Sequence, residues 1–497
     1  MRRQMPLPST SKKRGYAAAS NVARYGDFKS SMGSADYELR NGLSEVRAKV
    51  RFLARNSGSM KRFIQLLQVN VVGDQGFRFQ SRVKTTTGLL NQSLNERVED
   101  AFAMWADRAS ACGTMSLWDL EHQAVETWAR DGEVIWEIVS GPEYPDGVAI
   151  NPIEADLLDE TLNTIHGATN HEVRMGVEIN AVGRPVAYHF LTTHPGDATY
   201  ISYDMRRRYR RVPADRVLHL YKRQRPGQTR GEPPAAAMVL DVKMLDGYRE
   251  AETMARRLRS ALMGFFENEL PDARGIGELA NGEAVDEDGD GEDDLFEMQM
   301  EPGMLKQLPR GVSFKPFDPG GSQGDYHQFE SQVKKDISMG LGLSTMSHGM
   351  EVSGISYSSG RTVIQEDRDF YKVLQQFFIR GLMKRVFSVW TQMHLLFGEA
   401  PAFTPTQRMN IVRRYIFRPR GWEWVDPAKD VSANAEALRT RQTSLSRIAA
   451  QRGIDRNELL QEIADDQQAA AALGLTLDVD NDTSGGTSGE SADDDAE

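Results

Sequence analysis

One long helical pattern, at residues 353–398, constrains the fold of this chain more than any other stretch. Its apolar residues recur every three or four positions, which puts them on one face of a helix: Phe370, Leu374, Phe377, Phe378, Leu382, Val386, Val389, Met393 and Leu396. The opposite face carries polar side chains: Glu366, Lys372, Gln376 and Lys384. Serines and a glycine before Arg361 predict an N-cap, and Gly398 followed by Pro401 predicts the end of the helix.

The length of this helix restricts the architecture. A helix of about 40 residues reaches roughly 60 Å, which exceeds the width of a small domain. We therefore expect an elongated fold or a fold in which many copies pack side by side. Gly381, in mid-helix, predicts a bend or a close contact. Periodicity alone leaves open a long core helix of some other large protein.

The 497 residues suffice for two to four domains and a sizeable core. No apolar run approaches the roughly 18 residues that a membrane span needs, and no hydrophobic stretch follows the basic start, so we expect neither export nor insertion. The single cysteine, Cys112, excludes a disulfide within the chain and a cysteine-rich metal site. We expect Cys112 to be a small packing residue.

The net charge of −11 hides an uneven distribution. Residues 283–297 hold nine acids and no base, and residues 478–497 hold eight acids and no base. Removing these 17 negative charges changes the total from −11 to +6. The chain is thus a near-neutral body with a short basic start and two local acidic patches.

The remaining patterns predict a mixed α+β fold that is predominantly helical. Helical periodicity covers 34–72 with a break near 56–58, 93–108, 117–130, 235–270, 325–339, 431–452 and 455–473. Strands are predicted within 69–83, 130–141, 173–179, 184–192, 216–222 and 304–317. A long flexible loop is predicted at 340–356, and His219 is interpreted as a packed strand histidine.

An arginine-rich stretch, DMRRRYRRV (204–212), places five arginines in six positions around Tyr209. They are Arg206, Arg207, Arg208, Arg210 and Arg211. Such a stretch is suited to phosphate contacts. A solvated hairpin face or a docking surface for a protein partner fits the same pattern.

The acidic segment 286–297 satisfies the spacing of a calcium-binding loop. Asp286, Asp288 and Asp290 alternate as ligands, and Glu297 is the twelfth residue. The eighth position is Asp293 where an apolar residue belongs, and a poor helix former precedes the loop. A solvated acidic loop, or a calcium-stabilised binding protein as an alternative function, are both consistent with the pattern.

No arrangement for catalysis stands out. There is no GxxxxGK[ST] motif for ATP, and the Gly354-Ile355-Ser356-Tyr357-Ser358 stretch lacks the last glycine of a nucleophile elbow. His166 and His171 lie in an ordinary polar loop. We therefore expect no catalytic residue, no resident metal and no cofactor.

Several segments, in this order, resemble the portal proteins of lambda-type tailed bacteriophages: VNVVGDQGFRFQ (69–80), RDGEVIWEI (130–138), GVEINAVGRPVAYHFL (176–191), VLHLYKRQRPGQTRGEPP (217–234), YSSGRTVIQEDRDF (357–370) and WEWVDPAKD (422–430). A closing helix pair around RGID (452–455) is similar too. The resemblance covers about 25–465. Ser356 and Gly360 depart from the family's usual residues, and the acidic insert is not typical of it.

The resemblance implies a phage portal fold, which assembles about a dozen subunits into a ring around a central channel. The regions it implies are a flexible basic arm (1–24), a wing (25–234), a stem helix (235–270), a clip (271–324), a returning stem helix (325–339), a tunnel loop (340–358), a long helix with more wing (359–426), crown helices (427–473) and a disordered acidic tail (474–497).

The implied function is a structural channel for packaging and ejecting double-stranded DNA, in the virion at one capsid vertex, after assembly in the host cytoplasm. Implied partners are the terminase large subunit, the capsid or scaffolding protein, head-completion or tail connector proteins and the DNA, without sequence specificity. Candidate channel contacts are Ser347, His348, Met350, Ser353 and Ser356. Candidate partner-facing acids of the clip are Asp286, Asp288, Asp290, Asp293 and Asp294.

Overall fold

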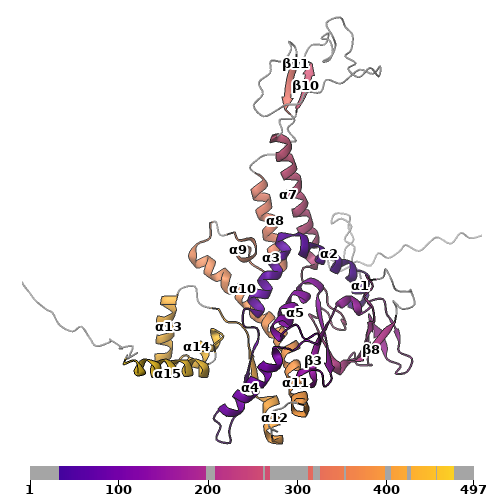
Figure 1. The fold of residues 1–497 in the computed structure, drawn as a ribbon. Helices are drawn as coiled ribbons and strands as arrows, with labels where there is room; N and C mark the ends of the chain where they lie inside the picture. The colour runs from indigo at the N-terminus through magenta and orange to yellow at the C-terminus, as the bar shows by residue number, and fades with distance from the viewer. Residues whose placement is uncertain are drawn as a thin grey trace, which may run out of the picture. The chain divides into compact units, whose positions relative to one another are not determined.

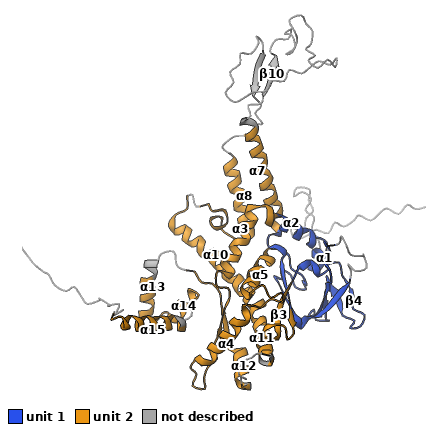
Figure 2. Ribbon diagram, in the orientation of Figure 1, with its two compact units in different colours: residues 1–52, 130–137, 153–236 blue, residues 53–129, 138–152, 237–497 orange. Residues whose placement is uncertain are grey.

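The computed structural model describes residues 33–197, 208–260, 264–268, 312–316, 325–351, 354–397, 404–422, 427–454 and 456–474. The chain divides into two compact units, which are coloured separately in Figure 2. Unit 1 comprises Met1–Phe52, Arg130–Glu137 and Ile153–Ala236, and unit 2 comprises Leu53–Ala129, Ile138–Pro152 and Ala237–Glu497. Helices dominate and small sheets are interspersed, which confirms the predicted mixed α+β class (Figure 1).

Unit 1 is built on short antiparallel strands. Its main sheet runs β4-β5-β6-β7-β8, with bounds Thr164–Ile165, Glu172–Arg174, Val177–Ile179, Pro185–Leu191 and Tyr209–Pro213. The helix α1 (Ala35–Arg40) and the start of α2 (Leu43–Asn56) belong to the same unit. A second sheet has the order β3-β2-β9. Unit 1 contributes β9 (Val217–Tyr221) and most of β2 (Glu133–Ser140), and β3 (Val148–Ile153) belongs to unit 2 up to Pro152. The core of unit 1 includes Ile135, Leu158, Val177, Phe190 and Val217.

The predicted strand 173–179 is in fact a tight hairpin. Strands β5 and β6 pair antiparallel, with Arg174 opposite Val177. The two residues between them have positive φ, 46° at Met175 and 82° at Gly176, as a two-residue hairpin turn requires. The prediction of one strand was wrong because methionine seldom occupies this backbone region.

Unit 2 holds most of the helices. Its first half contains α3 (Gly58–Leu67), a π-turn η3 (Gln68–Val72), α4 (Gln92–Ala106) and α5 (Leu117–Asp131). Its second half contains α7 (Val239–Ser260), α8 (Asp325–Leu341), α9 (Thr345–Gly349), α12 (Pro405–Arg413), α13 (Pro427–Arg439), α14 (Leu445–Gln451) and α15 (Arg456–Ala472). Two-stranded sheets pair β1 (Arg78–Ser81) with β12 (Tyr415–Arg418) and β10 (Gly264–Asn268) with β11 (Val312–Pro316).

The long helical pattern forms α10 (Tyr357–Phe378), a π-turn η8 (Ile379–Met383) and α11 (Lys384–Phe397). Ser356 is the N-cap, as predicted, and its side chain accepts the Ser359 N–H. Gly381, where the sequence predicts a bend or a close contact, lies inside the π-turn.

The π-turn changes which side chains are buried. The predicted positions Leu374, Phe378, Leu382 and Val386 are buried. From the π-turn onward the buried face also includes residues outside the predicted stripe, Met383, Phe387, Trp390 and His394, whereas the predicted Leu396 is 72% exposed. A π-turn holds one extra residue, which rotates the following face by about 100° relative to an uninterrupted α-helix.

An aromatic cluster forms the core at this end of unit 2. The ring of Phe79 on β1 lies 4.3 Å from that of Phe387 on α11, and Phe102 on α4 lies 5.0 Å from Trp390, centroid to centroid. The same cluster includes Trp105, Tyr415 and Phe417. These rings join α4, α11 and the β1-β12 pair into one packed layer.

Two predicted boundaries need correction. The predicted helix 235–270 ends at Ser260, because the aromatic stretch Gly264–Asn268 pairs as a strand with Val312–Pro316. The predicted helix 431–452 is two helices, α13 and α14, separated by a turn in which Arg441 has φ 59°. No described helix has both the length and the apolar composition needed to cross a bilayer.

Candidate functional site

The predicted loop 340–356 is largely structured. Helix α8 continues to Leu341, and α9 occupies Thr345–Gly349. Ser344 caps α9, because its side chain accepts the Ser347 N–H at 3.1 Å. Only a short segment between Met350 and Ser356 separates α9 from α10, and within it Val352 and Ser353 lie outside the described residues. The expectation of a long flexible loop is thus corrected.

Asp367 on α10 fastens α9 in place. Its carboxylate accepts the backbone N–H of Ser344 at 2.9 Å and the hydroxyls of Ser344 and Ser347. Asp367 is 5% exposed. Hydrogen bonds to a buried, charged acceptor are among the stronger hydrogen bonds in proteins. Asp367 therefore holds α9 against α10.

His348 ties α9 to two further helices. Its Nε2 lies 2.9 Å from the carbonyl oxygen of Ser59 on α3, and its Nδ1 lies 2.8 Å from the hydroxyl of Ser338 on α8. Burial lowers the pKa of His348, and the nearby Arg62 lowers it further. With both ring nitrogens engaged inside unit 2, His348 holds the segment in position and offers no free polar atom to an external ligand.

The other candidate contacts lie in different settings. Ser347 is half-buried through its bond to Asp367, whereas Met350 is 73% exposed with φ 53° and Ser356 is exposed at the start of α10. Ser353 lies outside the described residues, as do the acidic candidates Asp286, Asp288, Asp290, Asp293 and Asp294. The segment 286–297, whose spacing fits a calcium-binding loop, therefore also lies outside the described residues.

The arginine-rich stretch is partly neutralised by acids of unit 1. Arg206 and Arg207 lie outside the described residues. Arg210 on β8 donates to Glu137, and Arg211 donates through Nε to Glu178 at 2.8 Å. Arg208 is exposed where β8 begins. The two paired guanidiniums stabilise the sheet, which leaves less positive charge for a phosphate than the sequence suggests.

A buried ionic cluster organises unit 1. Arg230, 0% exposed, donates to Glu133 and to the carbonyls of Ala155, Leu158 and Met175. Burial alone would raise the pKa of Glu133, but the guanidiniums of Arg230 and Arg47 hold it well below its usual range. His219 adds a contact of 2.9 Å from Nε2 to the same carboxylate, which confirms a packed strand histidine.

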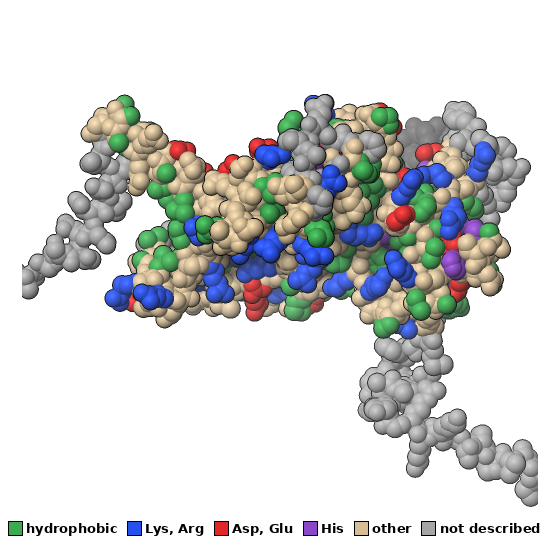
Figure 3. All heavy atoms as spheres, turned by 90° about the horizontal axis from the view of Figure 1, so that it is seen from below, with side chains coloured by type: hydrophobic (Ala, Val, Ile, Leu, Met, Phe, Trp, Pro, Cys, Tyr) green, Lys and Arg blue, Asp and Glu red, His purple; other side chains and the backbone are tan. Residues whose placement is uncertain are grey.

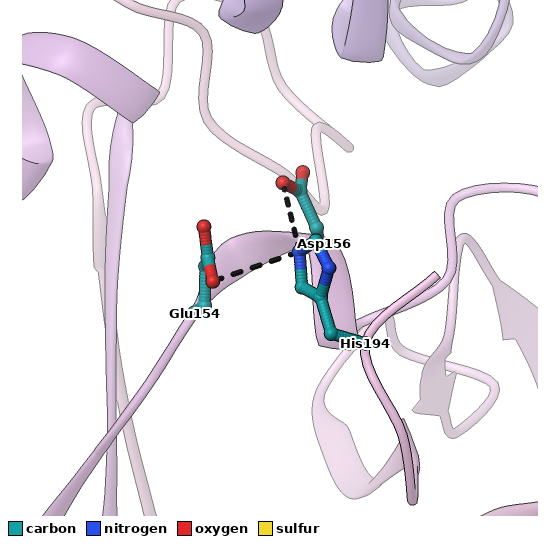
Figure 4. Close-up of side chains that lie close together, drawn as sticks. All are labelled: Glu154, Asp156 and His194. Carbon is teal, nitrogen blue, oxygen red and sulfur yellow. Dashed lines mark ion pairs between the residues drawn. The ribbon is translucent and has the colours of Figure 1, made fainter. Parts of the chain in front are cut away.

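Glu154, Asp156 and His194 lie close enough to hold a cation, as Figure 4 shows. The imidazole Nε2 of His194 is 3.6 Å from a carboxylate oxygen of each acid. Arg51 already donates to Asp156 and lies 3.3 Å from Glu154. Because a guanidinium supplies the positive charge here, we interpret the group as an ion-pair network.

Cys112 is exposed, so its predicted packing role was wrong. Hydrogen bonds from Ser110 and Thr114 lower the pKa of its thiol to about 7. Sequence reasoning also missed the role of Asp367, which lies in the predicted long helix but accepts hydrogen bonds from Ser344 and Ser347. The only sequence signal for this role was a polar residue on the buried stripe of that helix.

The comparisons with known proteins define the family. The family described as "Phage portal protein, lambda family" matches residues 23–375. A relative named "Probable portal protein" from Halomonas phage phiHAP-1 is 32% identical over 454 residues, covering 90% of this chain and 84% of its own. The "Portal protein" of Escherichia phage N15 is 22% identical, and the match covers 89% of this chain and 87% of the relative.

The chain therefore belongs to the lambda family of phage portal proteins. Among solved structures, it is similar to a chain from the neck of an empty GTA particle, with a TM-score of 0.43, 14% identity and coverage of 87% of this chain and 97% of that chain. A chain from the virion of the native gene transfer agent gives a TM-score of 0.41, 13% identity and coverage of 83% and 94%.

Proposed function

We propose that this chain builds the ring-shaped channel at one vertex of a tailed-phage capsid, through which double-stranded DNA is packaged and ejected. The observation that carries the proposal is family membership over residues 23–375, together with 32% identity to a relative that is matched over 84% of its length. The role is structural. We infer no bond-breaking step by the chain itself, and the calcium-stabilised alternative has no support in the comparisons.

The helix pair α7 and α8 supports assembly into a homo-oligomeric ring. The two helices contact each other through Arg249 and Glu330, whose Nη2 and Oε1 are 2.7 Å apart, and through stacked Tyr248 and Tyr326. Large apolar side chains remain exposed along the pair: Leu240, Met244, Met254, Phe329 and Met339. Such a stripe suits burial against a neighbouring copy.

We assign the regions by analogy with the family: wing 25–234, stem 235–270 and 325–339, clip 271–324, tunnel loop 340–358, further wing 359–426 and crown 427–473. Within the tunnel loop, the anchoring of α9 limits the exposed part to the residues around Met350 and Ser356. These two, with Ser353, are our channel contacts. Ser347 and His348 instead hold the loop to α10, α3 and α8.

The proposed partners follow from this placement. The acidic clip would face the terminase large subunit and later the head-completion or tail connector proteins, and the wing would face the capsid or scaffolding protein. The protein would be assembled in the host cytoplasm and remain in the virion.

Native mass spectrometry and negative-stain imaging of the purified full chain test the proposal. Closed rings of about twelve copies are expected. Monomers that form no ring under any assembly condition would overturn it. In parallel, ATPase and divalent-dependent nuclease assays should give background rates, because the inferred role includes no chemistry.

A further inference from the structure

Basic residues are concentrated in one stretch that the sequence patterns did not single out. Residues 380–420 contain a single acid, Glu399, and eight bases: Arg380, Lys384, Arg385, Arg408, Arg413, Arg414, Arg418 and Arg420. The chain as a whole carries a net charge of −11, whereas this stretch carries a net positive charge. A local excess of charge of one sign is typical of a surface that binds an oppositely charged partner.

The fold of unit 2 gathers part of this charge with bases from another segment. The backbone N–H of Arg82 donates to the carbonyl of Arg414 at 2.7 Å, directly after the paired residues Ser81 and Tyr415. The ring of Tyr415 in turn lies 4.4 Å from that of Phe387, one turn beyond Lys384 on α11. The segment after β1, the end of α12 and the start of α11 therefore meet at one place.

The side chains at this place face solvent. Val83 is buried and hydrogen-bonded to Asn95, so Arg82 and Lys84, on either side of it in an extended segment, point outward. Arg413 and Arg414 are exposed at the end of α12, and Lys384 is exposed on α11. We call Arg82, Lys84, Lys384, Arg413 and Arg414 the basic face. Figure 3, which views the molecule from below Figure 1, shows Lys and Arg side chains gathered over the middle of that surface.

Within the described residues, none of the five cations has an ion pair. On the adjoining helix α4, Glu99 accepts the backbone N–H of Ser81 at 2.7 Å, and Glu96 and Glu99 line a cavity beside Ser81. Like charges opposite each other across a strand pair, such as Arg82 and Arg414, destabilise the free protein. A polyanion would relieve that repulsion.

We propose that the basic face binds the phosphate backbone of double-stranded DNA. The guanidinium groups of Arg82, Arg413 and Arg414 can each donate two parallel hydrogen bonds to phosphate oxygens. Met409 and Val412 are also exposed on α12, which makes an acidic protein segment the competing partner. The inference rests on the proposed function but concerns a surface other than the tunnel loop.

The test uses assembled full-chain rings and a fluorescent DNA duplex of about 30 base pairs, with anisotropy measured at about 50 and 200 mM salt. The variant carries Arg82→Gln, Arg413→Gln and Arg414→Gln. The matched control removes three exposed arginines of unit 1, with Arg40→Gln, Arg184→Gln and Arg216→Gln. Native mass spectrometry confirms that both variants still form rings.

We expect the basic-face variant to bind at least about tenfold more weakly at the lower salt, with a salt slope smaller by about 3, while the control matches the wild type. Equal binding by the two variants would overturn the inference and leave the channel role standing. A poly-glutamate peptide that binds the wild-type rings as tightly as the duplex, and loses binding in the basic-face variant, would overturn the assignment to DNA in favour of an acidic protein.

Discussion

Two buried glutamates show how differently one residue type behaves in this protein. Glu133 in unit 1 sits between Arg230 and Arg47, and its pKa is held well below the usual range. Glu121 in unit 2 is 3% exposed and accepts one N–H, from Phe77 at 3.0 Å. Burial raises its pKa to about 8. The first carboxyl is thus charged and paired, and the second is neutral near pH 7.

Arg230 is the residue whose loss should cost most. Arg230→Met would leave Glu133 short of a partner and strip three carbonyls of their donor, so we expect a loss of about 3–5 kcal/mol in the free energy of unfolding, measured by urea denaturation. Arg225→Met is the control, because Arg225 pairs with Glu38 at an exposed site. It should cost less than about 1 kcal/mol. Similar losses in the two variants would contradict this account.

Glu121→Gln should stabilise the protein in a pH-dependent way. A carboxyl whose folded pKa is raised favours folding fully below its unfolded pKa, near 4.5, and that contribution is lost as pH rises toward about 8. Glutamine keeps an acceptor for the Phe77 N–H but never ionises. Thermal melts should therefore show a higher Tm for the variant at pH 8 and converging values near pH 4. A constant difference across this range would rule the explanation out.

At the scale of elements, helix α9 depends on side chains remote in sequence. Asp367→Ala removes the acceptor for one N–H and two hydroxyls, so we expect faster hydrogen exchange at 344–348 and a loss of about 1–3 kcal/mol. Asp369→Ala, two positions on, is the control, because Asp369 is exposed and bonds only Lys372 among the described contacts. Unchanged exchange at α9 in the Asp367 variant would show that other contacts hold it.

Much of the element order could be predicted, because periodicity and turn residues are local signals. The break near residue 57, the strand after Asp131-Gly132 and the helix begun by Ser356 were all predicted. What could not be predicted depends on distant partners. The aromatic strand Gly264–Asn268 reads as helix until Val312–Pro316 pairs with it, and Asp367 looks like a surface acid until α9 packs on it.

The candidate site also combines local signals, which the sequence carries, with contacts between distant segments, which it does not. The serines and glycines of the predicted loop marked the candidate segment, but they did not distinguish anchoring residues from exposed ones. His348 is inward because Ser59 and Ser338, 289 and 10 positions away, supply its partners. Gly340 begins the predicted flexible loop 340–356, yet it lies in α8 against Met238, where a Cβ atom would meet the sulfur at 2.1 Å.

At the scale of the whole molecule, ring formation should depend on the apolar stripe of α7. Leu240→Glu with Met244→Glu places two charges where 70% and 72% exposed apolar side chains would be buried by a neighbour. We expect native mass spectrometry to show monomers or small oligomers at concentrations where the wild type forms rings. Circular dichroism should be unchanged, because both side chains are exposed in the single chain.

The control for this experiment changes two apolar residues of similar exposure in unit 1, Val182→Glu and Ile165→Glu. Rings should form normally with this variant. If the α7 variant also assembles as the wild type does, the subunits must associate through other surfaces.

The π-turn at Ile379–Met383 sets a practical limit on engineering this helix. A cross-link, a fluorophore pair or a metal clamp can be placed on two residues four positions apart when both lie before the π-turn or both lie after it. Two residues at this spacing on opposite sides of the π-turn do not face the same side of the helix. A pair such as Lys372 and Gln376 belongs to the register of α10, and Lys384 and Ser388 belong to the register of α11. Deleting one residue of the π-turn should give one continuous α-helical register from α10 to α11. The same deletion should turn Trp390 away from Phe102.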